Sequence, residues 1–194
     1  MLKDLILKNR SYRRFDQSVI VPMSLLREMV EAARLSGSAR NMQPLRYMLF
    51  NNASDCEKIF HTLAWAGYLK EWPGPAEGER PSAYIVQLGD LDLTDDWWCD
   101  DGIAAQSMLL TAVEQGFGGC IVGSVQREKL RSLLKLDDRY KIIQVLALGK
   151  PAEKVVIDKV KRGGDMKGGD IRYWRDENGV HHVPKRSLDE LIIG

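Results

Sequence analysis

The sequence predicts a fold of mixed helices and strands that does not repeat a regular βαβ unit. Segments with apolar residues at helical spacing alternate irregularly with short apolar runs that are typical of buried strands. The chain has 194 residues and no internal repeat, which suits one domain with a sizeable core.

The predicted elements follow in order along the chain. Helical spacing and Pro or Gly boundaries predict helices over residues 2–9, from Pro22 to Gly37, and over 97–115. A capping box of Ser54 and Glu57 predicts the start of another helix, and Ser124 is the predicted cap of the last one. Apolar runs predict strands at 46–51, 83–89, 120–122 and 141–148. The helix over 97–115 is apolar nearly all round, which is typical of a buried centre or an interface between subunits.

The chain after Pro151 differs in kind. It begins charged and Gly-rich, and Asn178-Gly179 between the runs 171–175 and 180–183 predicts a β-hairpin. Because this segment has little apolar surface for a core of its own, we expect residues 152–194 to be a C-terminal extension. It would pack on the main body or on a partner chain, within a single domain spanning 1–194.

Composition argues against several classes of protein. The formal net charge is +1 and no region has a strong field of one sign, so neither nucleic acid nor membrane lipid is an expected partner. The chain has no secretory signal and no apolar run that could span a bilayer, which predicts a cytoplasmic protein. Its three cysteines, Cys56, Cys99 and Cys120, are far apart, so we expect small buried thiols and no metal site.

Two basic segments could bind a phosphate. Arg10-Ser11-Tyr12-Arg13-Arg14-Phe15 offers guanidinium groups, which match phosphate oxygens, and a hydroxyl that can donate one more hydrogen bond. Lys185 and Arg186 near the C-terminus offer two further cations. In both cases the alternative interpretation is a charged segment that only faces solvent.

Two segments of small residues could lie close to a flat ligand. Residues 36–44 place Gly and Ser beside Asn41 and Gln43, whose amides can pair with ring carbonyl and imide groups. Residues 116–124 lead to a strand end where backbone N–H groups could face a ligand, although the spacing is not that of a dinucleotide fingerprint. The alternatives are a plain polar loop and a tight turn.

The order of these segments resembles the FMN-dependent nitroreductase family over nearly the whole chain. The matching segments are Arg10 to Phe15, Ser38 to Pro44, Asp100 to Leu110, Gly119 to Gly123, Leu146 to Pro151, and Lys185-Arg186. The resemblance implies an α+β fold with a central mixed or antiparallel sheet surrounded by helices. It also implies an intertwined homodimer whose C-terminal extensions are exchanged.

The resemblance further implies a cofactor site. Arg10, Ser11 and Arg13 would hold the ribityl chain and phosphate of FMN, with Gly149, Lys185 and Arg186 close to the phosphate. Ser38, Ala39, Asn41 and Gln43 would line the flavin from the other chain, and Ile121, Val122, Gly123 and Ser124 would run past its ring. The resemblance assigns no catalytic side chain and no metal ligand.

The implied function is an FMN-dependent oxidoreductase. It would pass hydride from NADH or NADPH through flavin N5 to a nitroaromatic, a quinone or a similar small acceptor. Leu45 and Ile121 stand where some relatives have aromatic residues, so the flavin carries over more directly than the nitro-reducing activity. Alternatives are other flavin chemistry on the same fold (dehydrogenation, dehalogenation or flavin breakdown), a non-catalytic FMN-binding or storage protein, and a structural protein with an empty groove.

Overall fold

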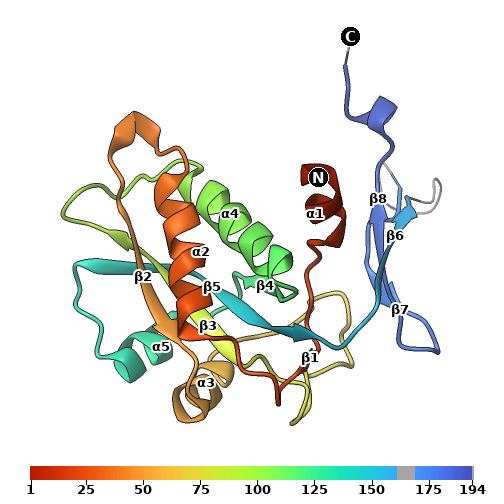
Figure 1. Ribbon diagram of the computed structural model, residues 1–194, viewed down its shortest axis with the longest axis horizontal. Helices are drawn as coiled ribbons and strands as arrows, with labels where there is room; N and C mark the ends of the chain where they lie inside the picture. Colours follow the sequence, from red (N-terminus) through yellow and green to blue (C-terminus); the bar gives the residue numbers. More distant parts are fainter. Residues whose placement is uncertain (161–168, 194) are drawn as a thin grey trace. The chain divides into compact units, whose positions relative to one another are not determined.

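The computed structural model describes residues 1–160 and 169–193 and divides into two compact units (Figure 1). The first unit comprises Met1–Trp65 and Gly74–Ala152, and the second comprises Ala66–Pro73 and Glu153–Gly194. The second unit thus begins close to the expected start of the extension, but it also takes in a segment from the middle of the chain. Most of the Gly-rich stretch after Pro151 falls at 161–168, outside the described residues. The single domain over 1–194 stays a prediction.

The first unit is built on a five-stranded sheet. Its strands are β1 (Phe15–Asp16), β2 (Leu45–Phe50), β3 (Ala83–Asp90), β4 (Gly118–Val122) and β5 (Tyr140–Pro151). The long strand β5 pairs with β3, β4 and β1, while β2 pairs with β3. All of these pairs are antiparallel, which resolves the expected mixed or antiparallel sheet in favour of the antiparallel one.

Helices cover both faces of this sheet. They are α1 (Leu2–Lys8), α2 (Met23–Leu35), α3 (Ala53–Phe60), α4 (Asp100–Glu114) and α5 (Arg127–Leu134). Alternate residues of a strand point to opposite faces, so Ala83 and Ile85 of β3 pack in one cluster with α2 and α4. Tyr84 and Val86 pack in a second cluster with α3 and α5. The α+β fold is therefore confirmed, and Figure 1 shows α2 and α4 side by side.

Three predicted helix starts are wrong. The N-cap of α3 is Asn52 rather than Ser54, because the Asn52 side chain accepts a hydrogen bond from the Asp55 N–H at 2.9 Å. The N-cap of α5 is Gln126 rather than Ser124, because the Ser124 carbonyl is engaged by the Ala64 N–H at 2.9 Å. Helix α4 begins at Asp100 rather than at residue 97, because Trp98 adopts a positive φ of 51°.

The thiol prediction is partly wrong. Cys56 and Cys120 are buried, but Cys99, which precedes the first turn of α4, is exposed. The late start of α4 explains the difference, because Cys99 stands outside the helix whose apolar surface would have covered it.

The second unit contains a three-stranded sheet of β6 (Val155–Lys159), β7 (Trp174–Arg175) and β8 (His181–Lys185). Strands β7 and β8 are antiparallel around the Asn178-Gly179 turn, so the predicted hairpin is confirmed. Strand β6 runs parallel to β8.

A short segment from the middle of the chain completes this unit. The ring of Tyr68 lies 4.9 Å from that of Tyr173, and the Arg175 guanidinium lies 4.2 Å from the ring centroid of Trp72. These contacts leave no signal in the sequence, because residues 66–73 and the extension are far apart along the chain. The extension therefore packs against part of its own chain.

Candidate cofactor site

Three of the predicted groups of cofactor residues meet at strand β4. Ser11 forms a parallel bridge with Gly119, and the Tyr12 N–H donates to the Gly119 carbonyl at 3.1 Å. Gly118 of β4 stands opposite Gly149 of β5. The sheet thus brings the segment from Arg10 to Arg13, strand β4 and Gly149 together.

One hydrogen-bond donor of Arg10, its Nε–H, is not used within the described residues. Its Nη2 donates to the Ile6 carbonyl at 2.6 Å, but its Nε is buried and finds no partner in the described part of the chain. Buried polar groups are almost always hydrogen-bonded, and an unpaired charged donor is costly. Within the described residues, this N–H is therefore still available to an acceptor. Arg13, two residues beyond Ser11, donates from Nη1 to the Ser11 carbonyl at 3.2 Å.

Two glycines allow the close packing at this place. A Cβ on Gly119 would lie 2.6 Å from the Ala147 carbonyl oxygen, and one on Gly149 would lie 2.8 Å from the Phe15 ring. Only glycine fits such approaches without movement of the backbone or the ring. Packing against Phe15 thus accounts for Gly149, and its predicted place near a phosphate stays a prediction.

The far end of β4 presents apolar side chain and backbone to solvent. Ile121 is 40% exposed, whereas Val122 next to it is buried, and Gly123 and Ser124 are exposed. Arg127 holds this turn, because its guanidinium donates to the carbonyls of Gly123, Ile142 and Ile143 at 3.4, 3.1 and 2.9 Å. Arg127 could not be singled out from the sequence, because its acceptors are backbone groups that leave no sequence signal.

The predicted loop of residues 38–43 is held by a buried carboxylate. Asp100, at the start of α4, accepts hydrogen bonds from Ser38 Oγ at 2.6 Å and from the Ala39 N–H at 2.9 Å. Ser38 Oγ in turn accepts from the Gln43 N–H at 2.9 Å. The Ser38 hydroxyl therefore shapes the loop itself. Asp100 lies in a motif of the sequence, but an acidic residue at a helix start is too common to reveal such a role.

The backbone of this loop is strained. Arg40, Asn41 and Gln43 have positive φ angles of 53°, 55° and 50°, a region that residues other than glycine seldom occupy. Such conformations persist only where the surroundings fix them, and the bonds to Asp100 do so here. The loop, which contains the short 3₁₀ helix Ala39–Asn41, therefore has a defined shape rather than the freedom of a plain polar connection.

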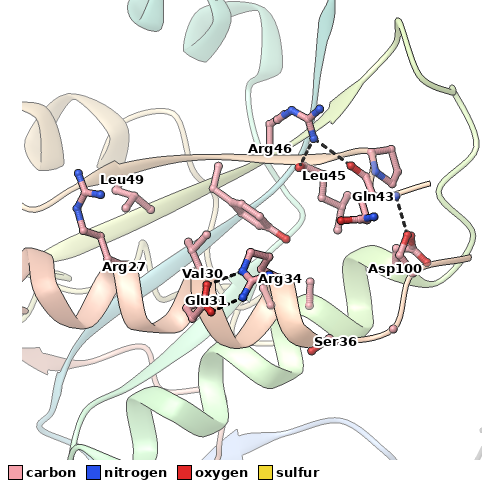
Figure 2. Close-up of a pocket in the computed structure, with 16 residues that line it drawn as sticks. Arg27, Val30, Glu31, Arg34, Ser36, Gln43, Leu45, Arg46, Leu49 and Asp100 are labelled. Atoms are coloured by element: carbon pink, nitrogen blue, oxygen red, sulfur yellow. Dashed lines mark hydrogen bonds and ion pairs between the residues drawn. The ribbon is translucent and has the colours of Figure 1, made fainter. Parts of the chain in front are cut away.

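A cavity of about 350 Å³ lies beside this loop, between α2 and β2 (Figure 2). Figure 2 shows Gln43 and Asp100 at one end, Arg27 at the other, and Arg34 paired with Glu31 along α2. The hydrogen bonds between the two side chains lower the pKa of the Glu31 carboxyl below its usual value and raise the pKa of the Arg34 guanidinium above its own. Both side chains are exposed and largely neutralise each other.

The loop of residues 38–43 and the segment from Arg10 to Arg13 lie beside different turns of α4. Gly119, the partner of Ser11, packs against Leu109, which lies nine residues after Asp100 in α4. At the rise of an α-helix this separation is about 13 Å. The structure thus gives two groups of predicted residues: the segments at β4, and the loop at Asp100. Lys185 ends β8 and Arg186 follows it, both in the second unit, and their approach to a phosphate stays a prediction.

No helix in the described ranges is long and apolar enough to cross a membrane. Among those same residues, no group of three or more His, Cys, Asp or Glu side chains is arranged to hold a metal ion.

Comparison with known proteins agrees with this fold. The profile described as "Nitroreductase family" matches residues 6–77 and 86–150. A candidate NAD(P)H nitroreductase of Bacillus subtilis is 21% identical over 179 aligned positions, which cover 75% of this chain and 86% of the relative.

Solved structures show the same architecture. An FMN-dependent nitroreductase from Clostridium difficile R20291 superposes with a TM-score of 0.62 at 21% identity, covering 76% of this chain and 87% of that one. The FMN complex of a candidate nitroreductase from Exiguobacterium sibiricum gives a TM-score of 0.66 at 18% identity, covering 79% and 89%. The fold is thus the α+β fold of these reductases. The chain belongs to the nitroreductase family.

Proposed function

We propose that this chain binds FMN and acts as an oxidoreductase on a small electron-poor acceptor. The observation that carries the proposal is the buried Arg10 Nε–H, which has no partner among the described residues and precedes Ser11 in the sequence. Ser11 in turn pairs with Gly119 of β4. A guanidinium and a hydroxyl are the donors that a phosphate takes. FMN is also the cofactor named for two reductases of the same fold.

The residues of this chain would bind and orient the flavin rather than react with it. Arg10, Ser11 and Arg13 would hold the phosphate and ribityl chain, and Ile121 would offer an apolar surface to the ring. The backbone N–H of Gly123 or Ser124, held in its turn by Arg127, would donate toward the N5 edge. When bound, FMN supplies the transfer of hydride from NADH or NADPH to a nitroaromatic, a quinone or a similar acceptor.

We further propose that the site is completed by a second copy of the chain. Along α4, Asp100, which holds the loop of Ser38, Ala39, Asn41 and Gln43, is separated by about 13 Å from Leu109, which packs against the partner of Ser11. In a homodimer the loop of one protomer would line the flavin that the other holds by its phosphate, and the C-terminal extensions would be exchanged. This arrangement gives the strained loop a function.

Titration with FMN tests the proposal. We expect the parent protein to bind FMN, and NADH or NADPH to reduce the bound flavin faster than free FMN. Binding without faster reduction would identify a storage protein instead. Absence of FMN binding would contradict the proposed function as a whole.

A further inference from the structure

A second cavity lies in the first unit and contains none of the predicted cofactor residues. It has a volume of about 110 Å³ and is enclosed by α3, the start of β3 and residues near β1. Its lining comprises Gln17, Ile20, Asn51, Ala53, Cys56, Glu57, Phe60, Arg80, Pro81, Ser82 and Tyr84. Nothing in the proposed flavin chemistry uses this cavity.

Two buried polar atoms at this cavity have no hydrogen-bond partner in the part of the chain that the structure describes. Tyr84 is fully buried, and its hydroxyl finds no hydrogen-bond partner among the described residues. The Nε of Arg80 is also buried and unpartnered in that same part of the chain. Burial raises the pKa of Tyr84 well above its usual value, so its hydroxyl stays protonated and can donate. Both groups can therefore act as hydrogen-bond donors at the lining of this cavity.

The other polar groups of the cavity already have partners. Arg80 Nη1 donates to both carboxylate oxygens of Glu57 at 2.6 and 2.7 Å. Cys56 Sγ donates to the Ser82 carbonyl at 3.5 Å, and burial raises its pKa to about 11, so the thiol stays neutral. The charges of Arg80 and Glu57 compensate each other. The open donors thus favour a neutral acceptor oxygen over an anion.

We propose that this cavity binds a small neutral molecule carrying one carbonyl oxygen, such as a ketone or an amide. The oxygen would accept hydrogen bonds from Tyr84 Oη and Arg80 Nε, and the apolar part of the ligand would pack on Ile20 and Phe60. A volume of about 110 Å³ is somewhat smaller than the roughly 150 Å³ of an apolar cavity that binds benzene, which limits the ligand to a small molecule.

Three probes of similar size test this proposal in the parent protein. Cyclopentanone carries the carbonyl, methylenecyclopentane has the same shape without an acceptor oxygen, and acetate replaces the neutral oxygen by a charged one. NMR titration should give the tightest binding for cyclopentanone. A crystal soaked with it should show its oxygen between Tyr84 Oη and Arg80 Nε. A cavity that holds only water in such crystals would overturn the proposal, and so would preferred binding of acetate or of the hydrocarbon.

Two substitutions assign the donors. Tyr84→Phe keeps the ring and removes the hydroxyl, and Arg80→Lys keeps the charge opposite Glu57 and removes the Nε–H. Each should weaken cyclopentanone binding by about tenfold, in line with the loss of one hydrogen bond. Tyr68→Phe, at an exposed tyrosine outside the cavity, is the matched control and should change nothing. Unchanged binding in both Tyr84→Phe and Arg80→Lys would refute the proposed contacts.

Discussion

Arg10 is distinguished from the other basic residues of its segment by a buried Nε–H that finds no partner among the described residues. Arg10→Ala should therefore weaken FMN binding by about 1.5–3 kcal/mol, because it removes a charge-assisted contact to phosphate. Equilibrium titration followed by flavin fluorescence measures this change. Lys58→Ala, which removes an exposed charge on α3, serves as the control. If Arg10→Ala binds FMN like the parent, the phosphate assignment is wrong.

Tyr84 allows a prediction on stability. Its buried hydroxyl has no partner in the described ranges, and an unsatisfied buried hydroxyl costs about 1–3 kcal/mol. Tyr84→Phe should therefore raise the free energy of unfolding of the ligand-free protein by a part of that amount. Denaturant unfolding measures the change, with Tyr68→Phe as the comparison. A loss of stability would mean that the hydroxyl is already satisfied, for example by an ordered water.

The sequence reveals some of these residues and hides others. The sequence predicts cofactor roles for Arg10, Ser11 and Asn41, because their types suit a flavin phosphate or ring and because their motifs resemble a family, and these roles stay predictions. Asp100 and Tyr84 could not be assigned a role, because their importance depends on partners distant in the sequence or on the absence of a partner. Such properties exist only once the chain is folded.

At the scale of elements, the loop of residues 38–43 depends on the first residue of α4. Asp100→Ala removes the acceptor for Ser38 Oγ and the Ala39 N–H, and should destabilise the protein by about 1.5–3 kcal/mol. It should also weaken FMN binding, because the strained loop loses its anchor. Asp101→Ala removes a charge from the same helix turn and should have a smaller effect on both quantities. Equal effects of the two substitutions would contradict the anchoring role.

The ends of β2, β3 and β5 are joined by a buried carboxylate. Asp90 accepts from Arg139 Nε and Nη2 at 2.8 and 2.7 Å, and Arg46 Nη2 lies 3.1 Å away. The Arg139 guanidinium holds the pKa of this carboxyl below its usual value. A lowered pKa contributes stability that is present above the unfolded-state value of about 3.9 and is lost as the pH falls through the folded value.

Asp90→Asn should therefore destabilise the protein near neutral pH, and the difference from the parent should close as the pH falls below about 4. Urea unfolding across this pH range measures it. Asp138→Asn, at a fully exposed carboxylate, should stay parallel to the parent. A constant difference between Asp90→Asn and the parent at all pH values would show that the charge of Asp90 does not contribute.

Element types could be predicted better than element ends. The helix and strand patterns appear in the structure because periodic burial in this fold matches the apolar spacing of each segment. The prediction of Ser124 as a helix cap is wrong because strand-like pairing continues past β4. Val125 forms a bridge with Leu63, and the Ser124 carbonyl accepts from the Ala64 N–H. Long-range pairing of this kind overrides a local capping preference.

At the scale of the whole molecule, the central question is whether two chains build one site. In a two-chain site, a heterodimer of an Arg10→Ala chain and an Asp100→Ala chain has one site with both parts intact. Co-expressed and purified heterodimer should then bind one FMN with parental affinity, whereas neither variant homodimer does so. Impaired binding at both sites of the heterodimer would show that each chain builds its own site. Sedimentation velocity checks that the species is a dimer.

The most direct test of the account is the visible absorption spectrum of the protein with FMN, recorded without oxygen before and after addition of NADH or NADPH. The account predicts flavin bands that belong to the protein and that bleach faster than those of free FMN under the same conditions. Bands that bleach no faster than free FMN would contradict the proposed oxidoreductase. A protein that stays colourless after incubation with FMN would contradict the flavin site itself.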